Sequence, residues 1–459
     1  MAEPLQAPPR PDAGVFAVLR HPAFCWILAA SLLSNLGNWM ETVGQSWLVQ
    51  KQTASPFLLE VLAAAEFVPV ALLALPAGVL ADRHDRRKLV LVGQVSMMVF
   101  GAVLAVLTHL GRATPGVIIA IAFLEGAAWA AVMPAWQALV PALVPRDELP
   151  SAIALNSAQF NVARFLGPML AGALLSTAGA AIVFDVNVAT FVAIVAALAI
   201  VRVEAKPQRK PLPRAEVPTQ GAGIPEVVSW AVHNPGPRRL LLGLFMFALL
   251  AAPVQGLMPF YADRLLQVGA HGYGILLSCL GGGAILGALM LAHLPRTYPR
   301  HHLIPLSMLG FALCATLYAG SSHFVLSCAV LAVAGVFWVS SLAASNTAMQ
   351  LLVPDSLRGR AMSVFGLAST GALALGHVLG GTLAQAAGAR AATLGTSATL
   401  ALFALWSAIA REPAIDSLDW APPPPHGLRA AVWEALTASS HRAQQVDAVR
   451  RGSAEPLEE

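Results

Sequence analysis

The feature that most constrains this 459-residue chain is a series of twelve long apolar runs. Each run holds roughly 18 or more mostly apolar residues, enough for an α-helix to cross a hydrocarbon layer of about 30 Å. Hydrophobic residues make up 57% of the sequence, whereas an average soluble domain holds about 45–50%. A soluble fold of this size has too little interior for that much apolar surface. The sequence therefore predicts an all-α membrane protein with spans at 23–49, 57–81, 89–110, 114–136, 150–177, 180–201, 238–261, 272–293, 303–320, 323–349, 359–387 and 391–410.

The fixed cations predict the orientation of these spans. Connections on one side carry only Lys51, Arg112, Arg264 and Arg390, whereas the other side holds the clusters at 83–88 and 202–214. An excess of Lys and Arg marks cytoplasmic loops. We therefore expect a multi-pass protein of the cell membrane, with both termini cytoplasmic as an even number of spans requires. This arrangement accounts for the formal charge of +4 without a nucleic-acid partner.

The signatures of several other function classes are missing from the sequence. It contains no phosphate-binding loop of the G-x-x-x-x-G-K-[ST] type and no H-E-x-x-H or G-x-S-x-G motif. The four cysteines lie within or beside apolar runs without C-x-x-C spacing, which is typical of buried thiols. The N-terminus lacks the pattern of a cleaved secretory signal. We expect no enzymatic activity, no cofactor and no metal site, and an ion gradient as the source of energy.

The two halves of the chain resemble each other. A shift of 209 residues places small and apolar residues of the first half on identical residues of the second, as for Gly78 on Gly287, Leu80 on Leu289, Gly167 on Gly376 and Gly172 on Gly381. The sequence therefore predicts two pseudo-repeated bundles of six helices, an architecture in which the halves rock about a site near the bilayer midplane. The predicted divisions are an N-terminal cytoplasmic segment 1–22, bundles 23–201 and 238–410, a cytoplasmic linker 202–237 with helical potential near 224–233, and a largely disordered cytoplasmic tail 411–459.

Four ionisable residues stand out inside the predicted spans: Glu41, Glu66, Glu125 and Arg164. A charge at the centre of a bilayer costs about 2.5–3.5 kcal/mol even on the gentler insertion scales, so each is a candidate functional residue. At 1.5 Å per residue, Glu41 and Glu66 lie about 13 Å below the outer ends of their helices, and Glu125 lies nearer the centre. We expect all four side chains to face the interior of the bundle.

Polar residues form stripes on two of the predicted helices. Ser34, Asn38, Glu41 and Gln45 recur at spacings of 4, 3 and 4, and Ser157, Asn161 and Arg164 follow the same period on the fifth span. Because lipid does not satisfy polar groups, such stripes must face protein or a water-filled cavity. The sequence thus predicts a polar interior in the first bundle.

The residues leave three interpretations of this interior open. In the first, Arg164 neutralises one glutamate and the pair holds helices together. In the second, one glutamate alternates between its protonated and ionised forms, with Glu41 and Glu125 ranked ahead of Glu66, and Arg164 tunes it. In the third, these groups contact a cationic or polar substrate directly. His377 in the eleventh span is interpreted as a satisfied interior histidine.

The connection between the second and third spans carries a recognisable motif. Its sequence, Gly78-Val-Leu-Ala-Asp-Arg-His-Asp-Arg-Arg-Lys88, resembles the loop signature called motif A in the major facilitator superfamily, with Asp85 where many members have glycine. The resemblance implies that Gly78, Asp82, Arg83, Arg86 and Arg87 form a gate that latches the cytoplasmic ends of the two halves. The alternative is that the basic residues serve only to orient the loop.

A second motif lies on the fifth span. The segment 163–172, with Gly167, Pro168 and Gly172, resembles the antiporter signature (motif C) of the same superfamily with alanine at two glycine positions. Together with the stretch 143–164, it resembles the branch of drug/proton antiporters that contains the enterobactin exporter and macrolide-efflux-type transporters. One departure concerns the helix 4 signature, which in many of these antiporters has an arginine four residues before a glycine. Here Ala122 stands at that position before Gly126.

These observations predict a secondary transporter that exports a small amphiphilic molecule, siderophore-like or drug-like, by proton-coupled alternating access. We expect small-molecule substrate, protons and the lipid bilayer as its partners, and a monomer. One alternative is a metabolite importer or an uncoupled facilitator of the same fold, which the missing helix 4 arginine favours. A second is a transporter-like membrane receptor or scaffold, which the absence of a recognisable signalling domain in 411–459 disfavours.

Overall fold

The computed structural model describes residues 15–201, 224–293, 300–354 and 357–410, together with residues 412 and 415. Its elements in the first half are η1 (Val15–Arg20), α1 (Pro22–Thr53), α2 (Pro56–Arg83), α3 (Arg86–His109), α4 (Pro115–Leu139), η2 (Val140–Leu143), η3 (Arg146–Glu148), α5 (Leu149–Thr177) and α6 (Ala180–Ile200). Those in the second half are α7 (Ile224–His233), α8 (Pro235–Gly256), α9 (Met258–Phe260), η4 (Tyr261–Leu265), α10 (Gly269–His293), α11 (Arg300–Gly320), α12 (Phe324–Leu352), α13 (Arg358–Ala387) and α14 (Ala389–Ile409).

Twelve of these helices are at least 21 residues long, and they match the twelve predicted spans. Ten combine this length with the mean hydropathy of a membrane span. The two long helices that do not are α1 and α5, the helices that carry the predicted polar stripes. The short helix predicted near 224–233 is α7, and α8 begins three residues before the predicted start at 238. Of the other predicted segments, 1–14, 202–223 and nearly all of 411–459 lie outside the described residues.

Local sequence signals place the helix ends. Proline occupies the first turn of α1, α2, α4 and α8, where its missing N–H costs no hydrogen bond. The turns before α6 and α14 each contain a glycine at positive φ, Gly179 at 84° and Gly388 at 89°, a conformation that residues with a Cβ rarely adopt. These glycines are 209 residues apart, the same offset that relates the two halves of the sequence.

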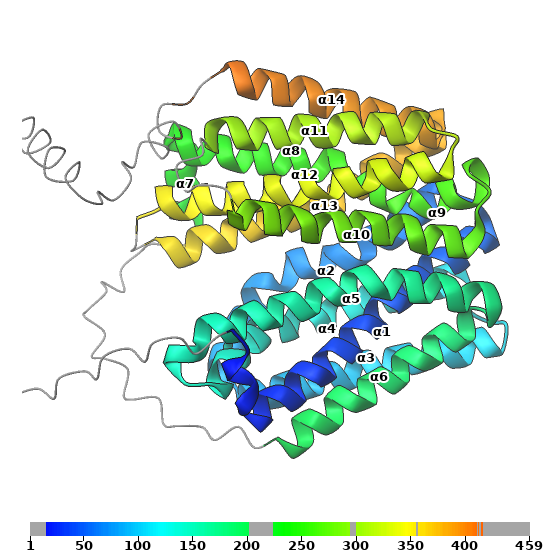
Figure 1. The fold of residues 1–459 in the computed structure, drawn as a ribbon, viewed down its shortest axis with the longest axis vertical. Coiled ribbons are helices and arrows are strands. Elements are labelled where there is room, and N and C mark those ends of the chain that lie inside the picture. The colour runs from blue at the N-terminus through cyan, green and yellow to red at the C-terminus, as the bar shows by residue number, and fades with distance from the viewer. Residues whose placement is uncertain are drawn as a thin grey trace, which may run out of the picture.

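The helices form two bundles, as predicted. Figure 1 shows α1 to α6 in the lower bundle and α8 with α10 to α14 in the upper one, with the helices of both running roughly side by side. Large apolar side chains on the outside of the bundles, such as Ile200, Val325 and Leu402, are more than two-thirds exposed to solvent. An outer surface of this kind suits contact with lipid tails.

The bundles meet along two seams, α2 against α13 and α5 against α10. The α5–α10 seam is tight at Gly172, where an added Cβ would lie 2.8 Å from the Ala270 carbonyl oxygen. The α2–α13 seam is tight at Gly381, where an added Cβ would lie 2.9 Å from the Cβ of Glu60. Gly172 and Gly381 are also related by the offset of 209. The pseudo-repeat thus supplies the same small residue to both seams, which lets the helix backbones approach closely.

These contacts lie in the half of the molecule that is predicted to face the outside. Across the same end, the Gln50 side-chain amide donates to Asp263 Oδ2 at 2.9 Å and Lys51 Nζ lies 3.1 Å from Asp263 Oδ1. Trp47 of α1 stacks on Tyr273 of α10, with ring centroids 6.2 Å apart. The largest apolar cluster also continues across this contact, from Met40 and Trp47 into the second bundle. The predicted external end is therefore closed.

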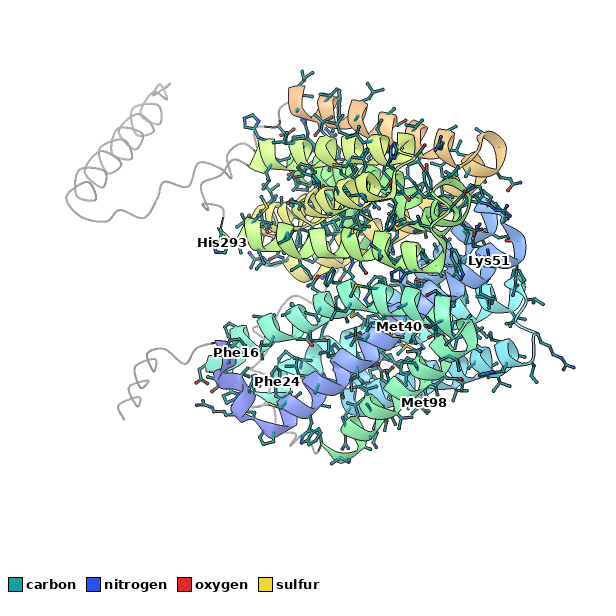
Figure 2. All side chains as sticks on the ribbon, turned by 45° about the vertical axis from the view of Figure 1, so that its right-hand side comes forward. Phe16, Phe24, Met40, Lys51, Met98 and His293 are labelled. Atoms are coloured by element: carbon teal, nitrogen blue, oxygen red, sulfur yellow. The ribbon has the colours of Figure 1, made fainter. Side chains whose placement is uncertain are left out.

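At the predicted cytoplasmic end the bundles are further apart. A Cβ added to Gly78 near the end of α2, or to Gly359, Gly366 or Gly371 on α13, would meet no atom within 4 Å. In Figure 2, Lys51 lies at the end where the bundles meet, whereas Phe16 and His293 lie at the other end on separate bundles. The structure thus has the geometry of a transporter that is open toward the predicted cytoplasmic side.

Candidate functional site

The interior of the first bundle holds a cluster of carboxyl groups, formed by the buried Glu41 on α1 and the half-buried Glu66 on α2 and Glu125 on α4. Glu41 is 4% exposed and accepts a hydrogen bond from Nδ2 of Asn187 on α6. Gln45, one turn along α1, donates from Nε2 to Oε2 of Glu125 at 3.0 Å. Gln45 thus lies one turn from Glu41 and is bonded to Glu125, and we refer to the two acids as the Glu41–Glu125 pair. The predicted stripe on α1 therefore reaches the predicted acid on α4.

The oxygen atoms of this cluster are short of donors. Oε1 of Glu41 and Oε1 of Glu125 are buried without a hydrogen-bond donor among the described residues. Two ionised carboxylates close together in a buried site repel, and a proton on one of them removes the repulsion and supplies a donor. Glu66 is the third carboxyl group of this cluster. The geometry of the Glu41–Glu125 pair thus fits a site that gains and loses a proton.

A polar cavity lies in the same bundle, on the predicted cytoplasmic side of the cluster. Its volume is about 260 Å³ and its walls come from α1, α3, α4, α5 and α6. Amides and hydroxyls such as those of Ser34, Asn35 and Asn161 alternate with the aromatic rings of Trp129 and Trp136. No acidic or basic side chain is among the described residues that line it. Ser34 belongs to the α1 stripe that leads on to Glu41, so the cavity and the carboxyl cluster share one helix face.

Arg164 does not pair with a glutamate in this structure. Its guanidinium carbon lies 5.7 Å from the ring centroid of Trp39 on α1, a cation–π arrangement. No carboxylate of the described residues forms an ion pair with it. The interpretation in which Arg164 neutralises a buried glutamate is therefore not realised here, because the aromatic ring of Trp39 takes the place of a counter-ion. Asn38, the neighbour of Trp39 in the predicted set, is half-buried.

The loop motif at 78–88 forms the end of α2 and the start of α3. Asp85 caps α3 by accepting a hydrogen bond from the Lys88 backbone N–H at 3.0 Å. Arg87 donates from Nε to the Leu198 carbonyl at 2.7 Å and from Nη2 to the Ala199 carbonyl at 2.8 Å. These carbonyls belong to the last turn of α6, which has no helical donors of its own. Arg87 thus ties the loop to α6.

Of the other motif residues, the described side chains of Arg83 and Arg86 form no hydrogen bond or ion pair with described residues. Arg83 is exposed and Arg86 is half-buried. The side chain of Asp82, the predicted latch acid, lies outside the described residues. Together with the open space beside Gly78, this places the motif at the separated end of the bundles.

The antiporter-type segment of α5 lies in the α5–α10 seam. Gly167 faces α1, where an added Cβ would lie 2.6 Å from Trp39 Cβ, and Gly172 faces α10. The backbone carbonyl of Pro168 lies against Gly274 of α10. All three residues therefore lie at close contacts between α5 and a neighbouring helix, α1 for Gly167 and α10 for Pro168 and Gly172.

Two functional groups escaped the sequence interpretation. Asn187 is fully buried and is the donor to Glu41; an amide inside the apolar span 180–201 is the signal that could have found it. Glu60 is fully buried and bonds His377 across the α2–α13 seam. Glu60 lies four residues after the start of α2, so a depth count from the helix end places it near the predicted outer surface and does not flag it. The structure gives His377 the partner that a satisfied interior histidine needs.

This architecture defines a class of protein. Two pseudo-repeated six-helix bundles, closed at one end and holding polar groups and a cavity inside, are a secondary transporter of the major facilitator fold. A family model described as "Transmembrane secretion effector" matches residues 13–434. The chain belongs to that family, and it is a multi-pass membrane protein.

Individual relatives agree with the predicted branch. The multidrug efflux pump Tap of Mycolicibacterium fortuitum is 27% identical over 399 residues, covering 82% of this chain and 92% of the pump. The enterobactin exporter EntS of Shigella boydii is 27% identical over 347 residues, covering 74% of this chain and 80% of the exporter. The predicted resemblance to exporters of this superfamily is thereby confirmed.

A solved structure confirms the predicted fold. A bacterial homologue of the human lysosomal transporter Spinster, in an inward-facing and unoccupied conformation, superposes with a TM-score of 0.71. The sequence identity is 15%, and the match covers 88% of this chain and 99% of that one. At this identity the likeness concerns the fold alone.

Proposed function

We propose that the protein exports a small amphiphilic molecule, drug-like or siderophore-like, from the cytoplasm by alternating access coupled to proton entry. The names of the relatives, a multidrug efflux pump and an enterobactin exporter, support export of such molecules. The cavity supports the amphiphilic character of the cargo, because it combines tryptophan rings with uncharged hydrogen-bonding side chains. Its position at the open end supports loading from the cytoplasm, given the orientation that the distribution of cations predicts.

The observation that supports proton coupling is the buried Oε1 of Glu41 and the buried Oε1 of Glu125, neither of which has a donor among the described residues. With one proton between them, the pair tolerates burial in the closed bundle. In the state that is open to the cytoplasm, the pair releases its proton to that side. When the site opens to the outside, the pair binds a new proton from there. The charge next to the cavity therefore changes in each half-cycle, and cargo and proton occupy the site in turn. Gln45 and Asn187 hold the two carboxyls in place through hydrogen bonds.

The loop motif supplies the gate at the opposite end. In the state that is open to the outside, Gly78 would face α13 closely and Asp82 would act as the latch acid beside Arg83 and Arg86. The open space at Gly78, Gly366 and Gly371 supports this role. These glycines have no close neighbour in the present state, so a close contact between α2 and α13 in the other state would explain why small residues stand there. Arg87 holds the loop on α6 in the present state.

One feature favours an uncoupled facilitator instead. The buried Ala122 of α4 stands where many proton-coupled relatives of the superfamily have an arginine. A transporter without proton coupling would move the same cargo down its own gradient, and the Glu41–Glu125 pair would then serve only to bind it.

Transport in proteoliposomes separates these possibilities. Purified protein is reconstituted, and uptake of a panel of amphiphilic drugs and siderophores is measured with and without an imposed pH gradient. For the transported compound, we expect the gradient to accelerate transport, and we expect Glu41→Gln and Glu125→Gln to remove that acceleration. Asp185→Asn is the control, because Asp185 pairs with His109 on the exposed surface. If both variants keep full gradient-driven transport, the carboxyl pair does not carry the proton.

A further inference from the structure

The Glu60–His377 pair joins the two bundles at the closed end. Glu60 lies on α2 of the first bundle and His377 on α13 of the second, and 2.5 Å separates Oε2 from Nδ1. The side chains are 0% and 4% exposed. The pair lies in the α2–α13 seam, beside the tight contact at Gly381. It therefore can exist only while the external ends of the two bundles are together.

The surroundings of the pair are apolar. Pro253 and Gly256 of α8 and Gly380 and Gly381 of α13 pack around Glu60, and Phe67 of α2 stacks on the imidazole with ring centroids 5.7 Å apart. None of these side chains is charged or titratable. His377 is the one charged group acting on Glu60 among the described residues. Glu66, six residues along α2, interacts instead with Glu125.

This environment fixes the number of protons that the closed pair holds. With one proton the pair is neutral overall, either as two neutral groups or as an ion pair. A second proton leaves a net positive charge in an apolar site, and loss of the proton leaves a net negative one. Both are costly inside a bilayer, so the closed pair is stable with one proton.

We propose that Glu60 and His377 form a proton-binding lock on the external gate, separate from the Glu41–Glu125 pair and independent of which molecule is exported. Opening the gate separates the two side chains and exposes both to external water. In water, glutamate and histidine titrate near about 4.3 and about 6.5, so above about pH 6.5 the separated groups hold no proton between them. Closing the gate then takes up one proton from the outside.

The closed pair and the separated groups hold different numbers of protons, so the equilibrium between the closed and open gate depends on external pH. Above about pH 6.5 the closed state binds one more proton than the open state, so the ratio of closed to open falls about tenfold for each unit that the external pH rises. Between about pH 4.3 and about pH 6.5 the separated groups already hold one proton, and the ratio is flat. Mild external acidity thus closes the gate, and the proton returns to the outside when the gate reopens.

Spin-label distances test the lock directly. The four native cysteines are replaced, and labels are attached at Arg112→Cys between α3 and α4 and at Ala391→Cys on α14, both exposed positions at the predicted external end on different bundles. Distance distributions are recorded from about pH 6.5 to about pH 8.5. With the native pair, the ratio of closed to open distances is expected to fall about tenfold per pH unit. In Glu60→Gln a neutral amide faces the imidazole, and the distribution is expected to stay constant over this range.

Two further variants assign the effect to this pair. Asp185→Asn removes a carboxylate that bonds a histidine on the surface of the first bundle alone, so the native pH profile should persist. Glu125→Gln should also keep the native dependence of the distances on pH, although we expect it to lose gradient-driven transport. The lock and the proton-coupling proposal can therefore be contradicted independently of each other. A native distribution that does not change with pH overturns the lock, as does a Glu60→Gln profile equal to the native one. The native profile decides the matter even where Glu60→Gln does not fold.

Discussion

At the scale of single residues, the buried acids depend on donors from neighbouring helices. Asn187 donates to Glu41 from α6, and Gln45 donates to Glu125 from α1. Neither carboxyl receives a donor from its own helix among these bonds. The cluster is therefore a property of the assembled bundle, and its protonation depends on the packing of α1, α4 and α6.

Replacing Asn187 with alanine should destabilise the first bundle. The change leaves a buried Glu41 oxygen without its donor, which costs about 1–3 kcal/mol. We expect a lower unfolding temperature in detergent, followed by intrinsic tryptophan fluorescence. Asn161→Ala is the matched control, because the Asn161 amide donates only to the Ser157 carbonyl of its own helix. Equal unfolding temperatures for the two variants would contradict the role given to Asn187.

The sequence predicted which acids lie inside the membrane but not how they are paired. Glu41, Gln45 and Glu125 were selected because their side chains had to avoid lipid, and the structure brings these three together. One of the open interpretations pairs Arg164 with a glutamate, whereas in the structure Arg164 lies over Trp39. The depth of a residue along its helix follows from counting, whereas its partner depends on the rotation and crossing of helices, which no single span encodes.

At the scale of elements, close contact between helices depends on glycines in equivalent positions of the repeat. Gly167 and Gly376 face the first helix of their own bundle, α1 and α8, while Gly172 and Gly381 face the other bundle. The offset of 209 residues predicted the repeat of these positions. It did not predict that the first of these pairs packs within the bundles and the second between them.

A side chain at Gly172 should keep the external end from closing. In Gly172→Val the new atoms would meet the backbone of Ala270 and Gly274 on α10, and backbone atoms cannot move aside without separating the helices. We expect the spin-label distance between positions 112 and 391 to shift toward the open population, and export to slow. Gly395→Val is the control, since the space around Gly395 is open. A native distance distribution in Gly172→Val would show that the seam tolerates separation there.

At the scale of the whole molecule, the structure is one of the two end states that alternating access requires. The glycines at the predicted external end are in contact, and those at the other end of α2 and α13 are not. The spans, their number and the repeat were predictable from hydropathy and from matches at one offset. Which end is closed was not, because both states use the same sequence and differ by little free energy.

A large side chain at Gly78 should therefore trap the present state. A Cβ added at Gly78 meets no atom within 4 Å here, so we expect Gly78→Leu to fold and to keep the thermal stability of the native protein. Transport should be lost, because the added side chain prevents α2 from approaching α13 when the cytoplasmic end closes. Thermal unfolding and proteoliposome transport measured on the same preparation check both halves of the prediction. Native transport rates in Gly78→Leu would show that this end never closes at Gly78.

The offset of 209 also places His377 of the second half on Pro168 of the first. The two halves of the fold thus carry different rings at equivalent positions. The pyrrolidine of Pro168 cannot ionise, whereas the imidazole of His377 can. In the proposed lock, the titratable ring therefore lies at the α2–α13 seam, and the equivalent position of the α5–α10 seam holds a proline. Duplication supplied two equivalent seams. A single divergent position, histidine in one half and proline in the other, is enough to let one seam respond to external pH.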